Sequence, residues 1–412
     1  MFDIEETMKN NELGIVFIGG FPPAIARLAE YNYEVISAMA KKLVKHRVKI
    51  YILANKDGTS SVEEFNYPSN IKVLRVWQKD NTLRLLLELV LMRRRADILL
   101  ISYYHGVFGS SAILNFLSTL LILILGKMLR YKVLVVLHTL PELRKTSLML
   151  SSRFFNHVYH LGFTITTLLI FKASHRVVLL VKIYRDVVCS MLPSLCSKIR
   201  YIPHGVPNYV YCSSKALSAS SKIKVAFIGL LSSRKNLLAL VEALSNVNRS
   251  LKSNTELVLI GAPHPYLPYN DLFTTVKRAV EKGISIKYIG YLPTKELQEY
   301  VCRCIDVVVL PYKLPTGTSG IAHFIASAAT PIVVPSFVEF VEIYKDGHGL
   351  VFFNKNGEDV IAELSKAICN VLTNEVKYRE LSKRAVNYAK THEITLTSLL
   401  LIKEVVHLYK GI

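Results

Sequence analysis

The sequence predicts an α/β protein made of two doubly wound parallel sheets. The chain has 412 residues, too many for one ordinary domain and about right for two. Short β-rich runs alternate with longer helical stretches, which is the pattern of parallel sheets with crossover helices. The alternation stops at a serine-rich segment, 206–221, and then starts again. Together these three observations indicate two such sheets joined by a linker.

The first half contains six β-rich runs, most of them almost wholly apolar. They lie at 14–18, 48–53, 71–76, 97–102, 132–137 and 175–181. Apolar strands of this kind are typical of a sheet that helices cover on both faces. The stretch 30–44 is one expected helix, because Val35, Met39 and Leu43 recur on one helical face.

The uncharged segment 107–126 is about long enough to span a bilayer. Serine, threonine and asparagine interrupt its apolar run, however, and a strand is expected on each side of it. Two parallel strands need a crossover connection between them. We therefore expect a crossover helix that is buried or faces a membrane, with a transmembrane span as the alternative.

The second half repeats the pattern. Its β-rich runs lie at 224–229, 256–261, 286–290, 307–311 and 331–335, and helical segments follow at 359–372, 375–391 and 395–409. We expect an N-terminal Rossmann-like domain over residues 1–208 and a C-terminal one over 209–394.

The chain is strongly basic, with a net charge of +20, and its first 212 residues carry 27 basic and 14 acidic side chains. Such a balance implies anionic partners, which include acidic lipids, phosphorylated small molecules and nucleic acid. No basic stripe with interleaved aromatic residues is visible, so nucleic acid is not an expected partner. A basic and apolar first half suits an anionic membrane surface.

The cysteines and the N-terminus indicate where the protein works. Six cysteines form no CxxC pair, and no histidine pair has the spacing of zinc ligands. We expect reduced cysteines and no metal site. Residues 1–12 are polar and acidic and lack the order of a signal peptide, so a cytoplasmic protein is expected.

Open parallel sheets bind ligands beyond the carboxyl ends of their strands, so the loops after the strands are the candidate sites. In the first half, Gly19 and Gly20 follow the first strand and would let backbone amides approach a phosphate. His138 directly follows strand 132–137, and His105 comes shortly after strand 97–102. Either could orient a hydroxyl or move a proton. Ordinary turns and a histidine bonded to a loop carbonyl are the alternatives.

In the second half, Gly229 ends a strand and is followed closely by Arg234 and Lys235. Adjacent cations at the start of a helix are unfavourable unless an anion binds there, and a diphosphate suits the pair. After strand 307–311 comes a loop of glycine, serine and threonine that would cradle an anion, made of Thr316, Gly317, Thr318, Ser319 and Gly320. His323 lies one helical turn further on and either reaches the ligand or packs. We expect these four loops, two from each domain, to face one another across a cleft.

At this point the chain resembles glycosyltransferase family 4, the retaining group with the GT-B fold. The resemblance covers nearly the whole chain as an ordered series of motifs. They are GGFPP (19–23), His138 with Glu142, IPHGV (202–206), FIGLLSSRKN (227–236), LVLIGA (257–262), YIGYLPTKEL (288–297), DVVVLPY (306–312), SGIAHFIASAATPIVVPS (319–336) and DGHGLVF (346–352).

The resemblance implies a nucleoside-diphosphate sugar bound to the second domain. Lys235 would bind the diphosphate with Arg234, and the amides around Ser319 and Gly320 would support it. Gly20 would approach the donor phosphate from the other domain, His138 would face the transferred sugar, and the final helix, about 395–412, would pack back on the first domain. Glu142 and His105 are candidates on the acceptor side.

This chain departs from the family pattern at two places. Leu230 stands where arginine is usual, and Arg234 is expected to supply that charge. Thr316 and Phe324 stand where a Glu-x7-Glu motif is usual, and Ser319, Gly320 and His323 fit a variant branch without it. We expect a retaining, metal-independent hexosyltransferase that acts on a glycan or lipid-linked acceptor at the cytoplasmic face of a membrane. A catalytically inactive relative that binds a nucleotide sugar or a partner protein is the alternative.

Overall fold

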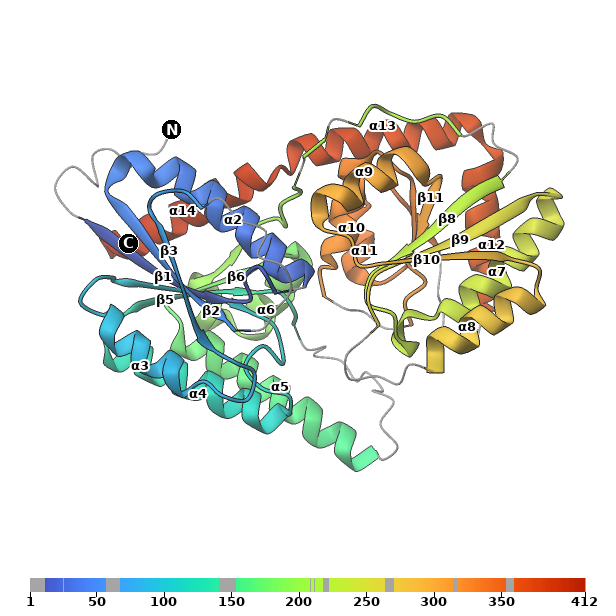
Figure 1. Ribbon diagram of the computed structural model, residues 1–412. Coiled ribbons are helices and arrows are strands. Elements are labelled where there is room, and N and C mark those ends of the chain that lie inside the picture. The colour runs from blue at the N-terminus through green and yellow to red at the C-terminus, as the bar shows by residue number, and fades with distance from the viewer. Residues whose placement is uncertain are drawn as a thin grey trace. The chain divides into compact units, whose positions relative to one another are not determined.

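The computed structural model describes residues 12–24, 26–56, 67–140, 153–207, 209–210, 212–217, 222–263, 270–313, 317–352 and 359–411. The chain forms two compact units (Figure 1). Unit 1 consists of Met1–Gly205 with Ile394–Ile412, and unit 2 consists of Val206–Glu393. Each unit is an α/β domain with its own parallel sheet.

Unit 1 contains a seven-stranded parallel sheet in the order β3-β2-β1-β4-β5-β6-β7. The strands expected from the sequence are all present, and a short edge strand, β7, joins them. The strands are β1 (Leu13–Gly19), β2 (Val48–Asn55), β3 (Ile71–Trp77), β4 (Ile98–Tyr103), β5 (Lys132–Leu137), β6 (Arg176–Leu179) and β7 (Ile199–Tyr201).

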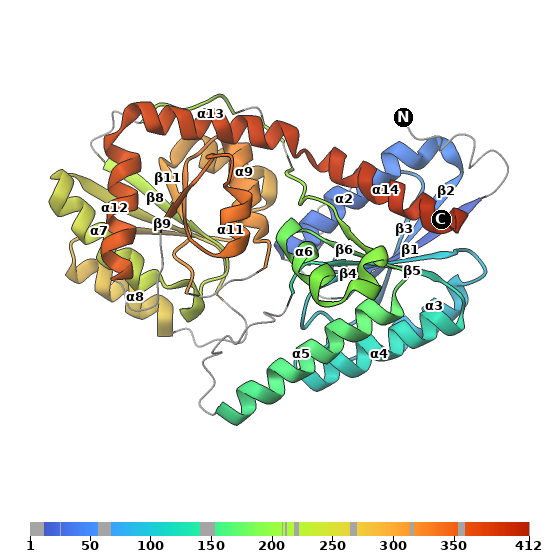
Figure 2. The ribbon, with the colours of Figure 1, turned by 180° about the vertical axis from the view of Figure 1, so that it is seen from behind.

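Helices cover both faces of this sheet, as its apolar strands require (Figures 1 and 2). On one face lie α2 (Arg27–Leu43) and α14 (Ile394–Lys410), which pack together over one half of the core. On the other face lie α3 (Leu83–Met92), α4 (Ala112–Met128) and α5 (Arg153–Ala173). α4 connects the parallel neighbours β4 and β5, so it is the expected crossover helix. No helix in the described part of the chain is both long and apolar enough to cross a membrane.

Unit 2 contains a six-stranded parallel sheet in the order β10-β9-β8-β11-β12-β13. Its strands are β8 (Lys222–Ile228), β9 (Asn254–Ile260), β10 (Ser285–Gly290), β11 (Val307–Val309), β12 (Ile332–Pro335) and β13 (Leu350–Phe352). Its helices are α7 (Leu237–Leu251), α8 (Asn270–Glu281), α9 (Thr294–Cys304), α10 (Gly320–Phe324), α11 (Val338–Ile343), α12 (Val360–Thr373) and α13 (Glu375–Thr391). The edge strand β13 was not expected, because its apolar run in the sequence is shorter than the run 307–311 that predicted β11.

The described part of the serine-rich segment packs on unit 2. The Lys215 ammonium donates to the Val301 and Ile305 carbonyls, at 2.8 and 3.0 Å, and to the Thr330 hydroxyl at 2.7 Å. Both carbonyls belong to the last turn of α9, where backbone acceptors have no partner within the helix. Lys215 therefore caps α9, and burial lowers the pKa of its ammonium to about 8.

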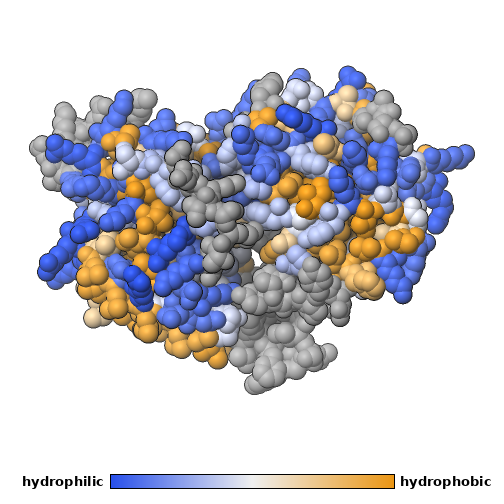
Figure 3. All heavy atoms as spheres, viewed as in Figure 1, coloured by the Kyte–Doolittle hydropathy of each residue, from blue (hydrophilic) through white to orange (hydrophobic). Residues whose placement is uncertain are grey.

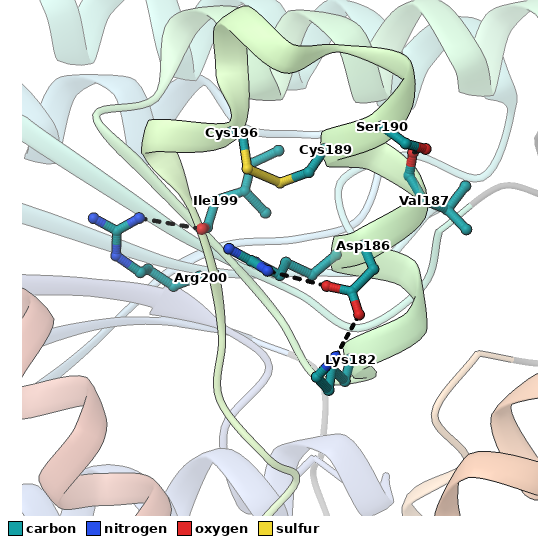
Figure 4. Close-up of polar contacts among 9 residues, drawn as sticks. Lys182, Asp186, Val187, Cys189, Ser190, Cys196, Ile199 and Arg200 are labelled. Atoms are coloured by element: carbon teal, nitrogen blue, oxygen red, sulfur yellow. Dashed lines mark hydrogen bonds and ion pairs between the residues drawn. A yellow bond between two sulfur atoms is a disulfide. The ribbon is translucent and has the colours of Figure 1, made fainter.

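The expectation that all cysteines are reduced is wrong in this structure. A disulfide joins Cys189, near the end of α6 (Lys182–Met191), to Cys196 in the next turn (Figure 4), and a second joins Cys212 to Cys302. The chain reverses after α6 and brings the first pair together, whereas the second pair is 90 residues apart in the sequence. Neither spacing follows a recognisable motif, so the sequence alone did not indicate the pairs.

Candidate functional site

Each sheet has one point where the order of its strands reverses. In unit 1 this point lies between β1 and β4, and in unit 2 it lies between β8 and β11. The connections leaving two such strands run in opposite directions, which opens a crevice at their carboxyl ends. The loops that the sequence singled out follow these strands or their neighbours.

In unit 2, a pair of glycines lets the ends of β8 and β9 approach closely. Gly229 has a φ of +138°, which strongly favours glycine. A Cβ atom at Gly261 would lie 2.0 Å from the Gly229 carbonyl oxygen, so no larger residue fits there. The turn after β8 is therefore fixed by backbone contacts, and the residues that follow it, including Lys235, lie at the switch point.

Lys235 and Tyr312 meet at this switch point from different strands. Lys235 ends the short helix Ser233–Lys235 after β8, and Tyr312 follows β11. The Lys235 Nζ atom lies 3.5 Å from the centre of the Tyr312 ring, and the Lys313 amide donates to the Arg234 carbonyl at 3.1 Å. Burial, and then the nearby Arg234 charge, lower the pKa of the Lys235 ammonium to about 7. Arg234 itself is exposed. No carboxylate among the described residues forms an ion pair with either side chain, so the pair offers positive charge to a ligand.

The loop before α10 borders the same point. Ser319 has a φ of +45° and Gly317 a φ of +78°, and the Tyr312 side chain is hydrogen-bonded to Ser319. A left-handed serine is strained by about 1 kcal/mol or more, and such strain is concentrated at functional sites. Gly320 begins α10. Thr316, the other expected member of this loop, lies outside the described residues.

His323 is buried and holds this loop in place through a hydrogen bond. It is 4% exposed, its Nε2 is hydrogen-bonded to the Thr318 hydroxyl at 2.8 Å, and its Nδ1 to the Tyr388 hydroxyl at 2.6 Å. Of the two roles left open by the sequence, packing is the one observed. Phe324, at one of the two glutamate positions of the family motif, is 5% exposed and belongs to the core.

In unit 1, the Gly19-Gly20 turn is held by side chains from three elements. The side-chain amide of Asn32 in α2 donates to the Gly20 carbonyl at 2.8 Å, and the side-chain oxygen Oδ1 of Asn55 at the end of β2 accepts from the Phe21 backbone amide at 3.1 Å. Arg75 of β3 donates to the Pro22 carbonyl. A rigid turn of this kind keeps the Gly20 backbone in place beside the switch point.

His138 lies at the end of β5 and is joined to this turn. Its Nε2 lies 2.9 Å from the Ser102 hydroxyl, which in turn donates to the Asn32 Oδ1 at 2.8 Å. Burial, assisted by the nearby His204, lowers the pKa of His138 to about 3, so the ring is neutral at pH 7. Gly20 and His138 therefore belong to one hydrogen-bonded group.

His105 lies outside this group. Its backbone amide donates to the Thr139 hydroxyl at 3.2 Å, its Nε2 contacts the Thr167 hydroxyl at 3.3 Å, and burial lowers its pKa to about 4. Glu142 lies outside the described residues. Within the described ranges, no three His, Cys, Asp or Glu side chains gather in a group that could hold a metal ion.

Sequence reasoning missed Asn32, Ser102 and Tyr312. Ser102 was visible as a polar residue near the end of an apolar strand, and Tyr312 as the residue after a strand. Neither signal distinguishes a functional side chain from an ordinary one. Asn32 gave no signal at all, because it lies in the middle of an amphipathic helix.

Two doubly wound parallel sheets in one chain, each with glycine and polar loops at its switch point, define the GT-B class of fold. Residues 213–392, which form most of unit 2, match the family model described as glycosyl transferases group 1. No curated protein sequence matches the chain significantly.

Several solved structures share the fold over nearly the whole chain. Sucrose-phosphate synthase from Thermosynechococcus elongatus has a TM-score of 0.73 at 14% identity and covers 97% of this chain and 100% of its own. HepE of Anabaena in complex with UDP and glucose has a TM-score of 0.66 at 14% identity, with 96% and 99% covered. WaaG, a glycosyltransferase involved in lipopolysaccharide biosynthesis, has a TM-score of 0.65 at 13% identity, with 96% and 99% covered.

Proposed function

We propose that this protein is a glycosyltransferase that moves a hexose from a nucleoside-diphosphate sugar to a glycan or lipid-linked acceptor. The observation that carries the proposal is the position of Lys235 and Tyr312 at the β8–β11 switch point, inside the region that matches the glycosyl transferases group 1 model. A cation with a lowered pKa beside a glycine turn suits a diphosphate. The HepE structure with UDP and glucose supports a donor of this class.

The residues of unit 2 suggest how the donor would be activated. Negative charge builds on the diphosphate as its bond to the sugar breaks. Lys235 and Arg234 offset that charge, and the backbone around Ser319 and Gly320 adds amide donors. Two protein cations in this position support a reaction that does not require a metal ion.

The stereochemistry and the acceptor follow from the resemblance to family 4 in its variant branch. The acceptor hydroxyl would attack on the face that the diphosphate leaves, so the anomeric configuration is retained. Gly19, Gly20 and His138 of unit 1 would contribute to binding the sugar, with Glu142 and His105 on the acceptor side. WaaG, a glycosyltransferase involved in lipopolysaccharide biosynthesis, supports an acceptor linked to lipid. The basic and apolar first half of the chain supports a peripheral position at the cytoplasmic face of a membrane.

The first test is release of nucleoside diphosphate from a panel of sugar nucleotides, with EDTA present, with and without a membrane lipid extract. We expect one donor to be cleaved and the release to rise with lipid. Lys235→Ala should lower kcat/KM by about 100-fold, because it removes charge stabilisation in the transition state. Lys366→Ala is the matched control, since Lys366 is exposed on α12. Full activity of Lys235→Ala would refute the proposed role.

A protein that binds a nucleotide sugar without turnover is the second candidate. Its support is Phe324, which buries an apolar ring at one position of the usual motif. Calorimetry with UDP-sugars separates the two functions. Clear donor binding with no diphosphate release from any acceptor mixture would favour the binding protein.

A further inference from the structure

The outer face of α3, α4 and α5 in unit 1 is apolar and uncovered. Figure 3 shows apolar residues gathered at the lower left, where Figure 1 has α3 and α4. α3 exposes Leu83, Leu87, Val90 and Leu91, and α5 exposes Leu161 and Ile165. α4 exposes a stripe that runs its whole length, made of Ile113, Leu114, Leu117, Leu121, Ile124 and Met128. We call this surface the apolar face.

Packing within unit 1 does not explain the apolar face, because α4 is apolar on both of its sides. Its buried side holds Ile122 and Leu123, which are 0% and 1% exposed, together with the polar residues Asn115 and Thr119. The Asn115 amide donates to the Tyr103 hydroxyl at 2.8 Å, and the Thr119 hydroxyl donates to the Asn115 carbonyl. A helix on a water-exposed surface normally has polar side chains on its outer side. The outward leucines of α4 therefore suit a partner outside the fold.

Basic side chains flank one end of the apolar face. The Arg93 guanidinium donates to the Leu129 carbonyl at 2.6 Å, so the C-terminal ends of α3 and α4 meet. Around this contact, Arg94, Lys127 and Arg130 are exposed and form no ion pair with any described residue. The sequences of the three helices include a single acidic residue, Glu88.

We propose that the apolar face binds the surface of an anionic lipid bilayer. A helix of 17 residues is about 25 Å long, so α4 can lie in the interface with its leucines among the upper parts of the lipid chains. The basic end then meets the headgroups, where each cation contributes about 1 kcal/mol. The inference stands on this face alone and does not depend on the transferase activity proposed above.

A second copy of the chain fits the apolar face less well. Two copies related by a two-fold axis present the same surface to each other, so each brings its own arginines and lysines. The helices offer almost no carboxylate to pair with them, and uncompensated like charges at an interface are unfavourable. An anionic lipid surface supplies the missing charge.

Vesicle sedimentation of the full chain tests the membrane proposal. We expect binding to vesicles of phosphatidylcholine with phosphatidylserine, much weaker binding to phosphatidylcholine alone, and weakening by salt. Replacing Leu117 and Leu121 together by serine should lower the partition coefficient by about tenfold or more. Arg94→Ser with Lys127→Ser should remove the preference for phosphatidylserine. Val376→Ser is the matched control, because Val376 is a 77% exposed residue on α13 of unit 2.

Leu117 and Leu121 are 45% and 49% exposed, so replacing them should lower the melting temperature by only a few degrees and leave unfolding cooperative, which separates docking from folding. Absence of binding to anionic vesicles at low salt overturns the proposal. A dimer seen by light scattering that Leu117→Ser with Leu121→Ser dissociates would overturn it in favour of a second copy.

A chain of hydrogen bonds in unit 1 supports a second inference, independent of the apolar face. Four groups form an unbroken chain of hydrogen bonds: the Gly20 carbonyl, the Asn32 side chain, the Ser102 hydroxyl and His138. The donor and acceptor properties of these groups determine the direction of each hydrogen bond in the chain. The Gly20 carbonyl only accepts, so the Asn32 amino group faces it and the Asn32 oxygen faces Ser102. The Ser102 hydroxyl donates its only proton to this Asn32 oxygen. In its contact with His138, the Ser102 oxygen must therefore accept a hydrogen bond from Nε2.

We infer that Asn32 and Ser102 are positioning residues that hold His138 with its proton on Nε2 and its Nδ1 available as an acceptor. Nδ1 has no hydrogen bond to any described residue, and His138 as a residue is partly exposed. A neutral imidazole in this tautomer accepts a hydrogen bond from a substrate hydroxyl. The inference about substrate rests on the proposed function, whereas the tautomer does not.

Nitrogen NMR of protein labelled at histidine tests the tautomer directly, with His138→Gln used to assign the signal. We expect a proton on Nε2 in the wild type and loss of that preference in Ser102→Ala. In the transferase assay, Ser102→Ala should lower kcat by about tenfold with KM little changed, and Ser102→Thr, which keeps the hydroxyl, should restore it. A wild-type ring protonated on Nδ1 overturns the inference whether or not the protein is active. An inactive wild type with the expected tautomer would instead refute only the proposed function.

Discussion

The charge of Lys235 is expected to depend on whether a ligand is bound. Its ordinary pKa of 10.5 falls to about 7 because the ammonium is buried near Arg234. An anion beside it would favour the charged form and return the pKa toward its usual range. Binding of a diphosphate is therefore coupled to protonation of this side chain.

We predict that UDP binding takes up a proton between pH 7 and about 10. Affinity should weaken by up to tenfold for each pH unit above 7, because the free protein must first regain the proton. Calorimetry in buffers of different ionisation enthalpy measures the uptake. Lys235→Arg stays charged throughout and should remove the pH dependence. Wild-type affinity that is flat from pH 7 to 10 would contradict the coupling.

His348 is a second residue whose environment sets its chemistry. It is 1% exposed, and its ring is stacked on Tyr388, with ring centres 3.9 Å apart, and tilted against Tyr344, with ring centres 4.7 Å apart. Neither ring nitrogen has a hydrogen-bond partner within the described residues. Burial, and then the nearby His392, lower its pKa to about 3.

We predict that this histidine destabilises the fold as the pH falls below 6.5. The unfolded chain takes up a proton there and the folded chain does not, so folding stability is lost progressively down to pH 3. At pH 5 the cost is about 2 kcal/mol. His348→Phe keeps the stacking and should make unfolding in urea less sensitive to pH between 7 and 5. An unchanged pH dependence would show that His348 is not responsible.

At the scale of elements, α14 completes unit 1 although it is the last helix of the chain. Its Leu401, Ile402 and Val405 lie in the core on the same face of the sheet as α2. Glu404 pairs with Arg176 and Arg200, at 3.4 and 3.6 Å, which adds a charged contact to the apolar one. α14 is therefore part of the first domain in structure, although the whole of unit 2 precedes it in the sequence.

Two leucines of α14 offer a matched pair of substitutions. Leu401 is 3% exposed and Leu399 is 42% exposed. We predict that Leu401→Ala lowers the free energy of unfolding of unit 1 by about 3 kcal/mol, because it leaves a cavity in the core. Leu399→Ala should change it by less than about 0.5 kcal/mol. Equal effects in chemical denaturation would mean that α14 does not pack as described.

At the scale of the whole molecule, the two units have separate cores. The apolar residues of unit 2 form one cluster, and those of unit 1 form two, one on each face of its sheet. The chain passes between the units only near Gly205 and near Glu393. Domains with their own cores generally unfold as separate cooperative units.

We predict two transitions in scanning calorimetry, of which UDP raises only that of unit 2. At a ligand concentration 100 times Kd, the stabilisation is about 2.7 kcal/mol. Lys235→Ala should abolish the shift and leave the other transition in place. A single transition that moves as a whole would contradict independent units. A shift confined to the transition of unit 1 would mean that UDP binds to unit 1 and not to unit 2.

The α/β class, the two parallel sheets and the loops that follow their strands were all predicted from the sequence. This was possible because alternation, apolar strands and glycine turns are local features, each recognisable within about ten residues. α4 was found as a crossover helix for the same reason. The edge strands β7 and β13 were missed because neither lies in an apolar run as long as the run 307–311 that predicted β11.

Which side chains meet depends on the folded arrangement of the strands and helices. Asn32 and Ser102 are 70 residues apart, Cys212 and Cys302 are 90 apart, and Lys235 reaches Tyr312 from a different strand. The packing of His323, one of two roles that the sequence left open, was decided by Tyr388, 65 residues further along. Contacts of this kind depend on how strands are ordered within a sheet, and a single sequence does not encode that order in any local pattern.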